Sequence, residues 1–124
     1  MDELVSEIES KREFGELICQ RLTECIKKLG FPVGTIKAYP DYQTVHFEMI
    51  QDPFTGKFNL SGFWTDQHGH KVGRVQFQSD ESCYAEYNVG YAHPDRPKWF
   101  VDNVIAWGKI DSIKTDLALI AFPE

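Results

Sequence analysis

The chain lacks the features of membrane-spanning and secreted proteins. No apolar run approaches the roughly 20 residues that a helix needs to cross a bilayer. The N-terminal segment is acidic and polar, unlike a secretory signal. Only three cysteines occur, Cys19, Cys25 and Cys83, and an odd number without paired spacing argues against a disulfide framework. We therefore expect reduced thiols and a cytoplasmic location.

The chain also lacks a surplus of basic residues. It has 13 Lys and Arg against 19 Asp and Glu, and its net charge is -6. Six acidic residues and two basic ones lie within residues 1–16, so most of the negative charge is N-terminal. Binding to nucleic acid or to an anionic membrane needs a basic patch, so neither partner is expected. A basic protein partner is favoured electrostatically.

Motifs of known chemistry are absent too. Gly62, Gly69 and Gly73 have neither Walker nor dinucleotide-binding spacing, and Ser61 and Ser82 lie in no nucleophile elbow. We therefore predict no catalytic residue and no cofactor.

What the chain does have is a change in the spacing of its apolar residues at Gly30-Phe31-Pro32. Before it, Ile18, Leu22 and other apolar residues recur at helical spacing, which predicts a helix over residues 3–29. Gly30 is placed to end this helix and Pro32 prevents its continuation. Residues 1–12 are less apolar, and they are expected either to fray or to form a separate acidic helix.

After the break, apolar and polar residues alternate between short turns, which predicts antiparallel strands. His93 to Pro97 form a rigid connection, and Lys98–Trp107 then has helical spacing. The last segment, Asp116–Phe122, fits a strand or a helix, and we favour the extended form. The expected fold is α+β, a single domain over 1–124: an N-terminal helix packed on a five-stranded antiparallel meander, with a C-terminal helix and a short final segment (strand or helix). The predicted strands are Val33–Ala38, Thr44–Ile50, Lys57–Thr65, His70–Gln78 and Ser82–Ala92.

The polar face of this sheet supplies the first candidate site. His46, Glu48, Arg74 and Glu86 alternate with the apolar positions, so they can converge on neighbouring strands as an acid-base or anion-binding group. Ordinary cross-strand charge pairing on a solvated face is the favoured interpretation.

Two aromatic residues are candidates for protein contacts. Phe54 lies in a predicted turn and Phe63 falls on the polar face. Exposed aromatic side chains anchor protein interfaces, so both are candidate binding residues, although packing under the C-terminal segment is an equally good interpretation.

The segment from Asp66 to His70 is the most metal-like part of the chain. Asp66, His68 and His70 fall short of a full zinc ligand set, so no metal is predicted and these three stay weak candidates. Cys83 and His93 suggest a nucleophile and its base, but Cys83 alternates with apolar residues and is expected to be a core thiol.

The order of a helix, a meander and a closing helix is similar, at the level of architecture only, to secretion chaperones, immunity proteins and cystatin-like domains. The leading hypothesis is a small acidic cytosolic protein-binding module, chaperone-like or immunity-like, without catalytic activity. The alternative is a small-molecule-binding or catalytic domain with a pocket between the sheet and the C-terminal helix. A homodimer that pairs an exposed sheet edge or face is compatible with both.

Overall fold

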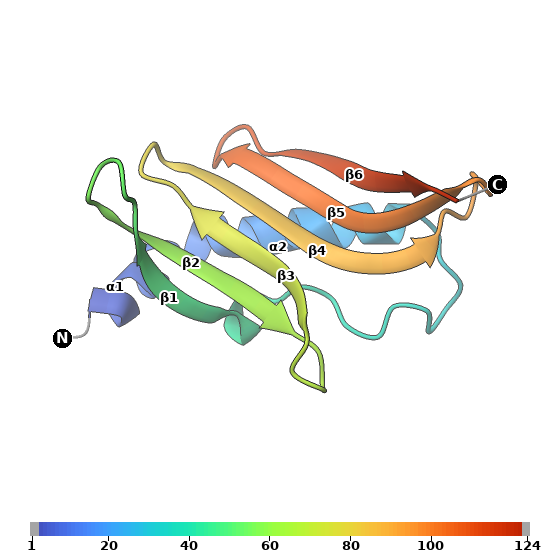
Figure 1. The fold of residues 1–124 in the computed structure, drawn as a ribbon, viewed down its shortest axis with the longest axis horizontal. Helices are drawn as coiled ribbons and strands as arrows, with labels where there is room; N and C mark the ends of the chain where they lie inside the picture. The colour runs from blue at the N-terminus through green and yellow to red at the C-terminus, as the bar shows by residue number, and fades with distance from the viewer. Residues whose placement is uncertain (1–2, 123–124) are drawn as a thin grey trace.

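The computed structural model describes residues 3–122, which form two N-terminal helices and one antiparallel sheet (Figure 1). The fold is therefore α+β, but the sheet has six strands instead of the predicted five, and the described residues contain no C-terminal helix. The elements are α1 (Glu3–Ser10), α2 (Arg12–Lys28), a short 3-10 helix η1 (Tyr42–Thr44), β1 (His46–Gln51), β2 (Phe58–Thr65), β3 (Lys71–Phe77), β4 (Ser82–Ala92), β5 (Trp99–Lys109) and β6 (Lys114–Ala121).

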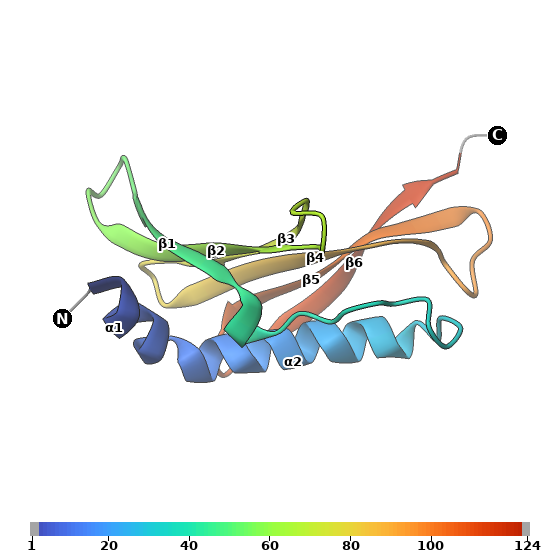
Figure 2. The same cartoon turned by 90° about the horizontal axis from the view of Figure 1, so that it is seen from below.

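The six strands follow one another in the sheet in chain order, each antiparallel to the next. Short connections allow no other arrangement of neighbours. Both helices lie against the same face of the sheet, and α2 runs along its length (Figure 2). No helix of residues 3–122 covers the opposite, outer face, and β1 and β6 form the two edges.

The predicted helix over residues 3–29 is divided at Lys11, which leaves the helical conformation between α1 and α2. The acidic residues Glu3, Glu7 and Glu9 lie on α1, which contains no buried residue. Gly30 follows the end of α2 with a φ of 71°, a conformation that glycine adopts without strain. The prediction that Gly30 ends the helix is confirmed.

The core lies between α2 and the inner face of the sheet. One stripe of α2 is buried there, and Ile18 and Leu22 have no exposed surface. Trp64, Val75 and Val104 face this stripe from the sheet as members of the same core cluster. Full burial of an aliphatic side chain contributes about 1.5–3 kcal/mol to folding, so this helix-on-sheet contact is the main source of stability.

The predicted strand Val33–Ala38 is not a strand. Gly34 has a φ of 84° and Thr35 N–H donates to the Pro32 carbonyl at 3.0 Å, which makes a turn where the strand was expected to begin. The chain then runs back along α2 without pairing to the sheet (Figure 2). The β-branched residues of this segment favoured a strand. Local composition carries no information on whether a neighbouring strand is within reach, so the prediction was wrong.

The predicted helix Lys98–Trp107 is strand β5, and Asp116–Phe122 falls largely within strand β6. An extra residue, Asp102, interrupts the register of β5 between Val101 and Asn103. This β-bulge shifts the alternation by one residue, so that Val101 and Val104 are both buried. Two inward-facing residues three positions apart have the spacing of a helix, so the apolar pattern of this strand predicts a helix.

Tyr42 joins the helices to the connecting segment. Its hydroxyl donates to the Ile8 carbonyl at 2.6 Å, and its ring lies directly over Gly15 of α2. Next to it, Trp64 Nε1 donates to the Asp41 carbonyl at 2.9 Å. Burial raises the pKa of the Tyr42 hydroxyl above its ordinary value. The segment is therefore attached to α1, α2 and β2 at one point.

We predict that Gly15→Ala destabilises the protein, although the same change in an open helix stabilises by about 1 kcal/mol. An added Cβ would overlap the Tyr42 ring, and overpacking costs about 1–3 kcal/mol. The free energy of unfolding, measured by urea denaturation, should fall. In a Tyr42→Ala background the ring is gone and Gly15→Ala should become neutral or stabilising; an equal loss in both backgrounds would contradict this explanation.

Candidate functional site

Three of the four predicted polar residues lie in one row across the outer face of the sheet. His46 on β1 is opposite Phe63 on β2, Phe63 is opposite Arg74 on β3, and Arg74 is opposite Glu86 on β4. Side chains directly opposite one another on antiparallel strands are about 4.5–5.5 Å apart at Cβ. The meander therefore aligns residues 46 and 86 in one row, with β2 and β3 between them.

The Arg74 end of this row is internally paired. Arg74 Nε donates to Glu86 Oε1 at 2.8 Å, and the Tyr84 hydroxyl donates to Glu86 Oε2 at 3.2 Å. The Arg74 guanidinium also lies 5.4 Å from the centre of the Tyr84 ring. Partial burial and the nearby Glu86 carboxylate raise the pKa of Tyr84. Because each charge has its partner inside the group, this end of the row behaves as a structural cross-strand pair.

The His46 end of the row is a stack of rings. The His46 and Phe63 rings are stacked with centres 5.2 Å apart, and Lys71 Nζ lies 4.5 Å from the centre of the Phe63 ring. His46 Nε2 is also 3.3 Å from Thr65 Oγ1. Phe63 is half-buried by these neighbours, so it is a less open contact residue than Phe54.

Glu48 is displaced from the row by two residues along β1, because its partner on β2 is Ser61. Glu48, Lys71, Arg74 and Glu86 nevertheless line one shallow hollow of about 310 Å³ on the outer face. Glu48 and Glu86 lie on β1 and β4, three inter-strand spacings apart, or roughly 14 Å. That distance is larger than the separation of a paired carboxylate acid and base in glycosidases, which is about 5–9.5 Å.

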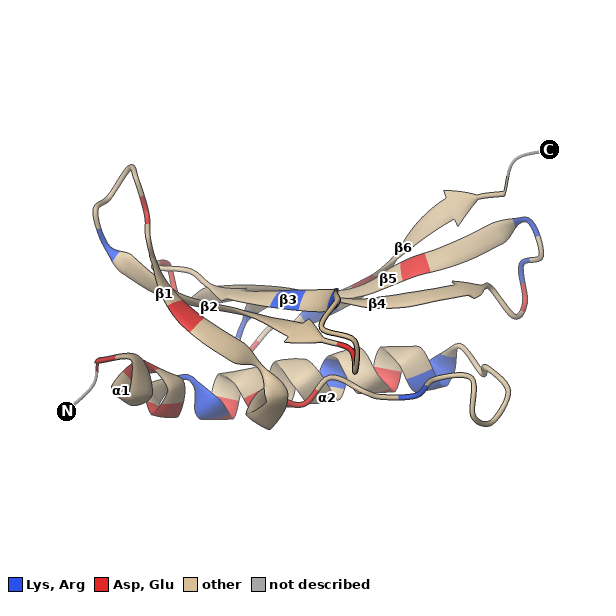
Figure 3. Cartoon of the chain, turned by 60° about the horizontal axis from the view of Figure 1, so that its bottom comes forward, with Lys and Arg blue, Asp and Glu red and all other residues tan. Residues whose placement is uncertain are grey.

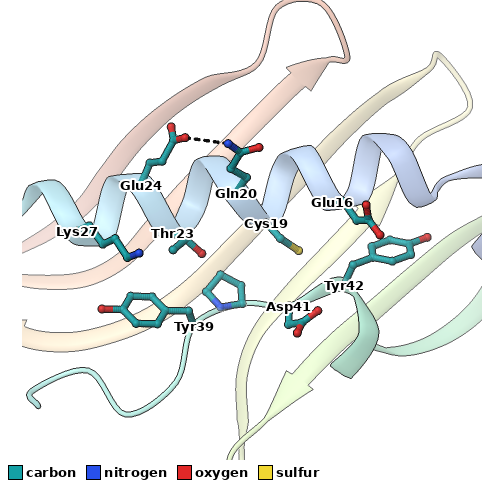
Figure 4. A pocket seen from close by; sticks show the side chains of 10 residues that line it. Glu16, Cys19, Gln20, Thr23, Glu24, Lys27, Tyr39, Asp41 and Tyr42 are labelled. Atoms are coloured by element: carbon teal, nitrogen blue, oxygen red, sulfur yellow. Dashed lines mark hydrogen bonds between the residues drawn. The ribbon is translucent and has the colours of Figure 1, made fainter.

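A second hollow, which the sequence did not reveal, is a groove of about 510 Å³ between α2 and residues 39–42 (Figure 4). Glu16, Cys19 and Thr23 line it from α2, and Tyr39 and Asp41 line it from the connecting segment. Since residues 33–38 were predicted to be a strand, no signal in the sequence placed this segment beside α2.

Several charged side chains of this groove interact with neighbouring residues. Lys27 Nζ lies 5.5 Å from the centre of the Tyr39 ring, and Gln20 Nε2 donates to Glu24 Oε1 at 3.2 Å on the outer flank of the helix (Figure 4). Glu16 is 3.6 Å from a guanidinium nitrogen of Arg12. Burial, with the Asp41 and Glu16 carboxylates nearby, raises the pKa of Cys19 to about 12. The thiol of the groove is therefore protonated at neutral pH and is a poor nucleophile.

The weak metal candidates lie together in the β2–β3 hairpin, but their carboxylate is already engaged. Asp66 Oδ1 accepts backbone N–H groups of His68 at 2.8 Å and of His70 at 3.0 Å. These hydrogen bonds, the one from His70 most of all, lower the pKa of Asp66. Within residues 3–122, no group of three or more His, Cys, Asp or Glu is arranged to hold a metal ion.

Cys83 and His93 do not form a pair. They lie at opposite ends of β4, which runs from Ser82 to Ala92. Cys83 is 1% exposed, as expected for a core thiol, and burial raises its pKa to about 12. His93 Nδ1 accepts the backbone N–H of Asp95 at 3.1 Å in the β4–β5 hairpin.

Phe54 is at the tip of the β1–β2 hairpin and is 95% exposed. Two further large apolar residues, Ile50 and Phe58, are exposed on the strands that lead into the same hairpin. Both residues were expected within strands, and neither was expected at the surface. The only feature of the sequence that could have indicated their exposure is their position next to a predicted turn.

Comparisons with known proteins identify no relative. No protein-family model, no curated protein and no solved structure matches this chain. Among the helices of residues 3–122, none is long and apolar enough to cross a membrane.

We predict that the three thiols differ in reactivity in the folded protein. Cys25 is only half-buried, whereas Cys19 and Cys83 are buried with pKa values of about 12. A thiol reagent at pH 8 should therefore label Cys25 first and the other two only on unfolding; the labelled positions are read by mass spectrometry. Rapid labelling of Cys19 in the folded state would contradict the burial of the groove thiol.

The same two thiols predict a loss of stability at high pH. Their pKa values are raised above the ordinary value of 9.0, so the folded state holds protons that the unfolded state releases. Stability from this source is complete below about pH 9 and falls as pH rises toward 12. Urea denaturation at pH 8 and pH 10 measures the loss, which should decrease in a Cys19→Ala variant.

Proposed function

We propose that the chain is a protein-binding module that presents Phe54 to an apolar pocket of a partner and the acidic helix α1 to basic residues around that pocket. The observation that carries the proposal is the 95% exposure of Phe54 on a hairpin that also exposes Ile50 and Phe58. Aromatic anchors of this kind contribute most to the free energy of binding at protein interfaces.

The hairpin tip is ordered by its own hydrogen bonds, which supports a binding role. Asp52 Oδ1 accepts the backbone N–H of Phe54 at 2.8 Å and that of Thr55 at 3.4 Å. Gln51 Nε2 donates to the Gly56 carbonyl at 3.2 Å. A loop that is already ordered loses less conformational entropy on binding, so Phe54 is well placed to act as an anchor.

Helix α1 lies beside this hairpin. Glu7 lines one hollow with Lys57 and Phe58 of the hairpin, and Glu9 is paired with Arg12. Helix α1 contacts β1 and β2, and it carries Glu3, Glu7 and Glu9 with no basic residue (Figures 2 and 3). Charges at the rim of an interface steer association and select partners of opposite charge. The expected partner therefore has Lys or Arg beside an apolar pocket. We assign the module to the cytoplasm, where three free thiols stay reduced.

The alternative, a small-molecule or catalytic domain, depended on a pocket between the sheet and a C-terminal helix. That helix is strand β5, and the inner face of the sheet is packed against α2 by Leu22, Trp64, Val104 and their neighbours. The predicted pocket therefore loses the helix that was to form one of its walls, and we do not favour this alternative.

We predict that a protein captured by the wild-type chain from native lysate is lost when Phe54 is changed to Ala. The matched control is Val33→Ala, because Val33 is also a fully exposed apolar residue in a loop but lies at the far end of α2. The captured protein, identified by mass spectrometry, should be retained by Val33→Ala and should dissociate as salt concentration rises.

The acidic contribution has its own test. Changing Glu3, Glu7 and Glu9 together to Gln should reduce the salt dependence of binding and slow association, with little change in dissociation.

Equal capture by wild type and Phe54→Ala at low salt would overturn the proposal.

A further inference from the structure

Strand β6 is a free edge of the sheet. Its residues pair only with β5 among the residues that the structure describes, and no element lies beyond it (Figure 1). An edge strand presents unpaired N–H and C=O groups, which are a template for another strand.

From Leu117 onward this edge lacks the features that normally prevent strand pairing, and its two charged residues, Lys114 and Asp116, lie at the start of the strand. Residues 117–122, Leu-Ala-Leu-Ile-Ala-Phe, contain no charge, proline or glycine, and the nearby bulge belongs to β5. Ile120 is 52% exposed and Phe122 is 44% exposed. The other edge strand, β1, carries Glu48 and His46. Charged residues on an edge disfavour pairing with another chain, so β6 is the edge better suited to it.

The hydrogen bonds of the last residue show which groups of β6 point outward. Phe122 N–H donates to the Lys98 carbonyl at 3.0 Å, so residue 122 faces β5. N–H groups alternate between the two sides of a strand, so the backbone groups of Ala121, Leu119, Leu117 and Thr115 face away from the sheet. Two antiparallel strands exchange hydrogen bonds where such outward-facing residues lie opposite one another.

We propose that β6 pairs antiparallel with β6 of a second copy of this chain, with Ala118 opposite Ala118 on the two-fold axis. This register places Leu117 opposite Leu119 and Thr115 opposite Ala121. The Leu117 N–H, which donates to Asp116 Oδ1 at 2.8 Å in the single chain, exchanges that acceptor for the Leu119 carbonyl of the second copy. The resulting dimer has one continuous sheet through both chains. It uses a surface different from the Phe54 hairpin and does not depend on the proposed function.

The charges favour a second copy as the occupant. In this register Lys114 of one chain lies opposite Phe122 of the other, and Asp116 lies opposite Ile120. No like charges are opposed, and an ammonium beside an aromatic ring is attractive. A two-fold axis requires the same surface on both copies, and antiparallel pairing sets the charged start of each strand beside the uncharged end of the other, so that no charge meets its like.

The register is tested with single cysteines. Opposite residues that do not share hydrogen bonds have Cα atoms about 4.5 Å apart, within disulfide range. Ala118→Cys should therefore give an oxidised dimer on a non-reducing gel. Ile120→Cys is the matched control, because the two copies of residue 120 would be about 14 Å apart along the strands. Wild type measures the background from the native thiols. Equal crosslinking at positions 118 and 120 would overturn the register.

The dimer itself is tested by light scattering. Wild type should have twice the chain mass of 14.3 kDa, and Ala121→Pro should have the mass of one chain, because proline removes an outward-facing N–H that β5 does not use. Circular dichroism should be unchanged in this variant. A wild-type chain that is monomeric at every concentration would overturn the proposal, whatever the outcome of the Phe54 experiments.

Discussion

The packing of α2 against the inner face of the sheet is the contact on which the rest of the structure depends. Ile18 and Leu22 have no exposed surface and Val104 lies buried opposite them. A single antiparallel sheet has one apolar face that has to be covered, and α2 is the only long helix among the described residues. Since this contact occupies the inner face, the surfaces open to a partner are the outer face, the hairpin tips, the strand edges and the exposed side of the helices.

The connecting segment between α2 and β1 follows from the same contact. Gly15 lets the Tyr42 ring reach the helix backbone. Trp64 donates to the Asp41 carbonyl, and the Tyr42 hydroxyl donates to the Ile8 carbonyl. Residues 39–42 are thereby placed beside α2, and the groove that contains Cys19 results. The high pKa of this thiol has the same origin, because burial by the segment disfavours the thiolate. The groove is thus a consequence of how the chain crosses the helix.

Much of the fold could be predicted from local patterns. The buried stripe of α2, the end of the helix at Gly30 and the strands β1 to β4 all have a clear period of 3.6 or 2. Strand β5 could not be predicted, because the bulge at Asp102 changes the phase of alternation within one strand. The row from His46 to Glu86 depends on register across four strands, which no local pattern contains. Only the tendency of these residues toward one face was visible.

Phe54 and Phe63 show why surface sites are the hardest part to predict. Both interrupt a polar pattern, yet Phe63 is covered by His46 and Lys71 from the neighbouring strands, while Phe54 has no neighbouring strand to cover it. The same reasoning applies to β6, whose residues fit helical spacing as well as the extended form that we favoured. A regular strand with one solvated face alternates in polarity, but β6 is apolar on both faces from Leu117 onward. The ambiguity of the pattern therefore has a structural cause: apolar side chains lie exposed at an unpaired edge, where a solvated strand would carry polar ones.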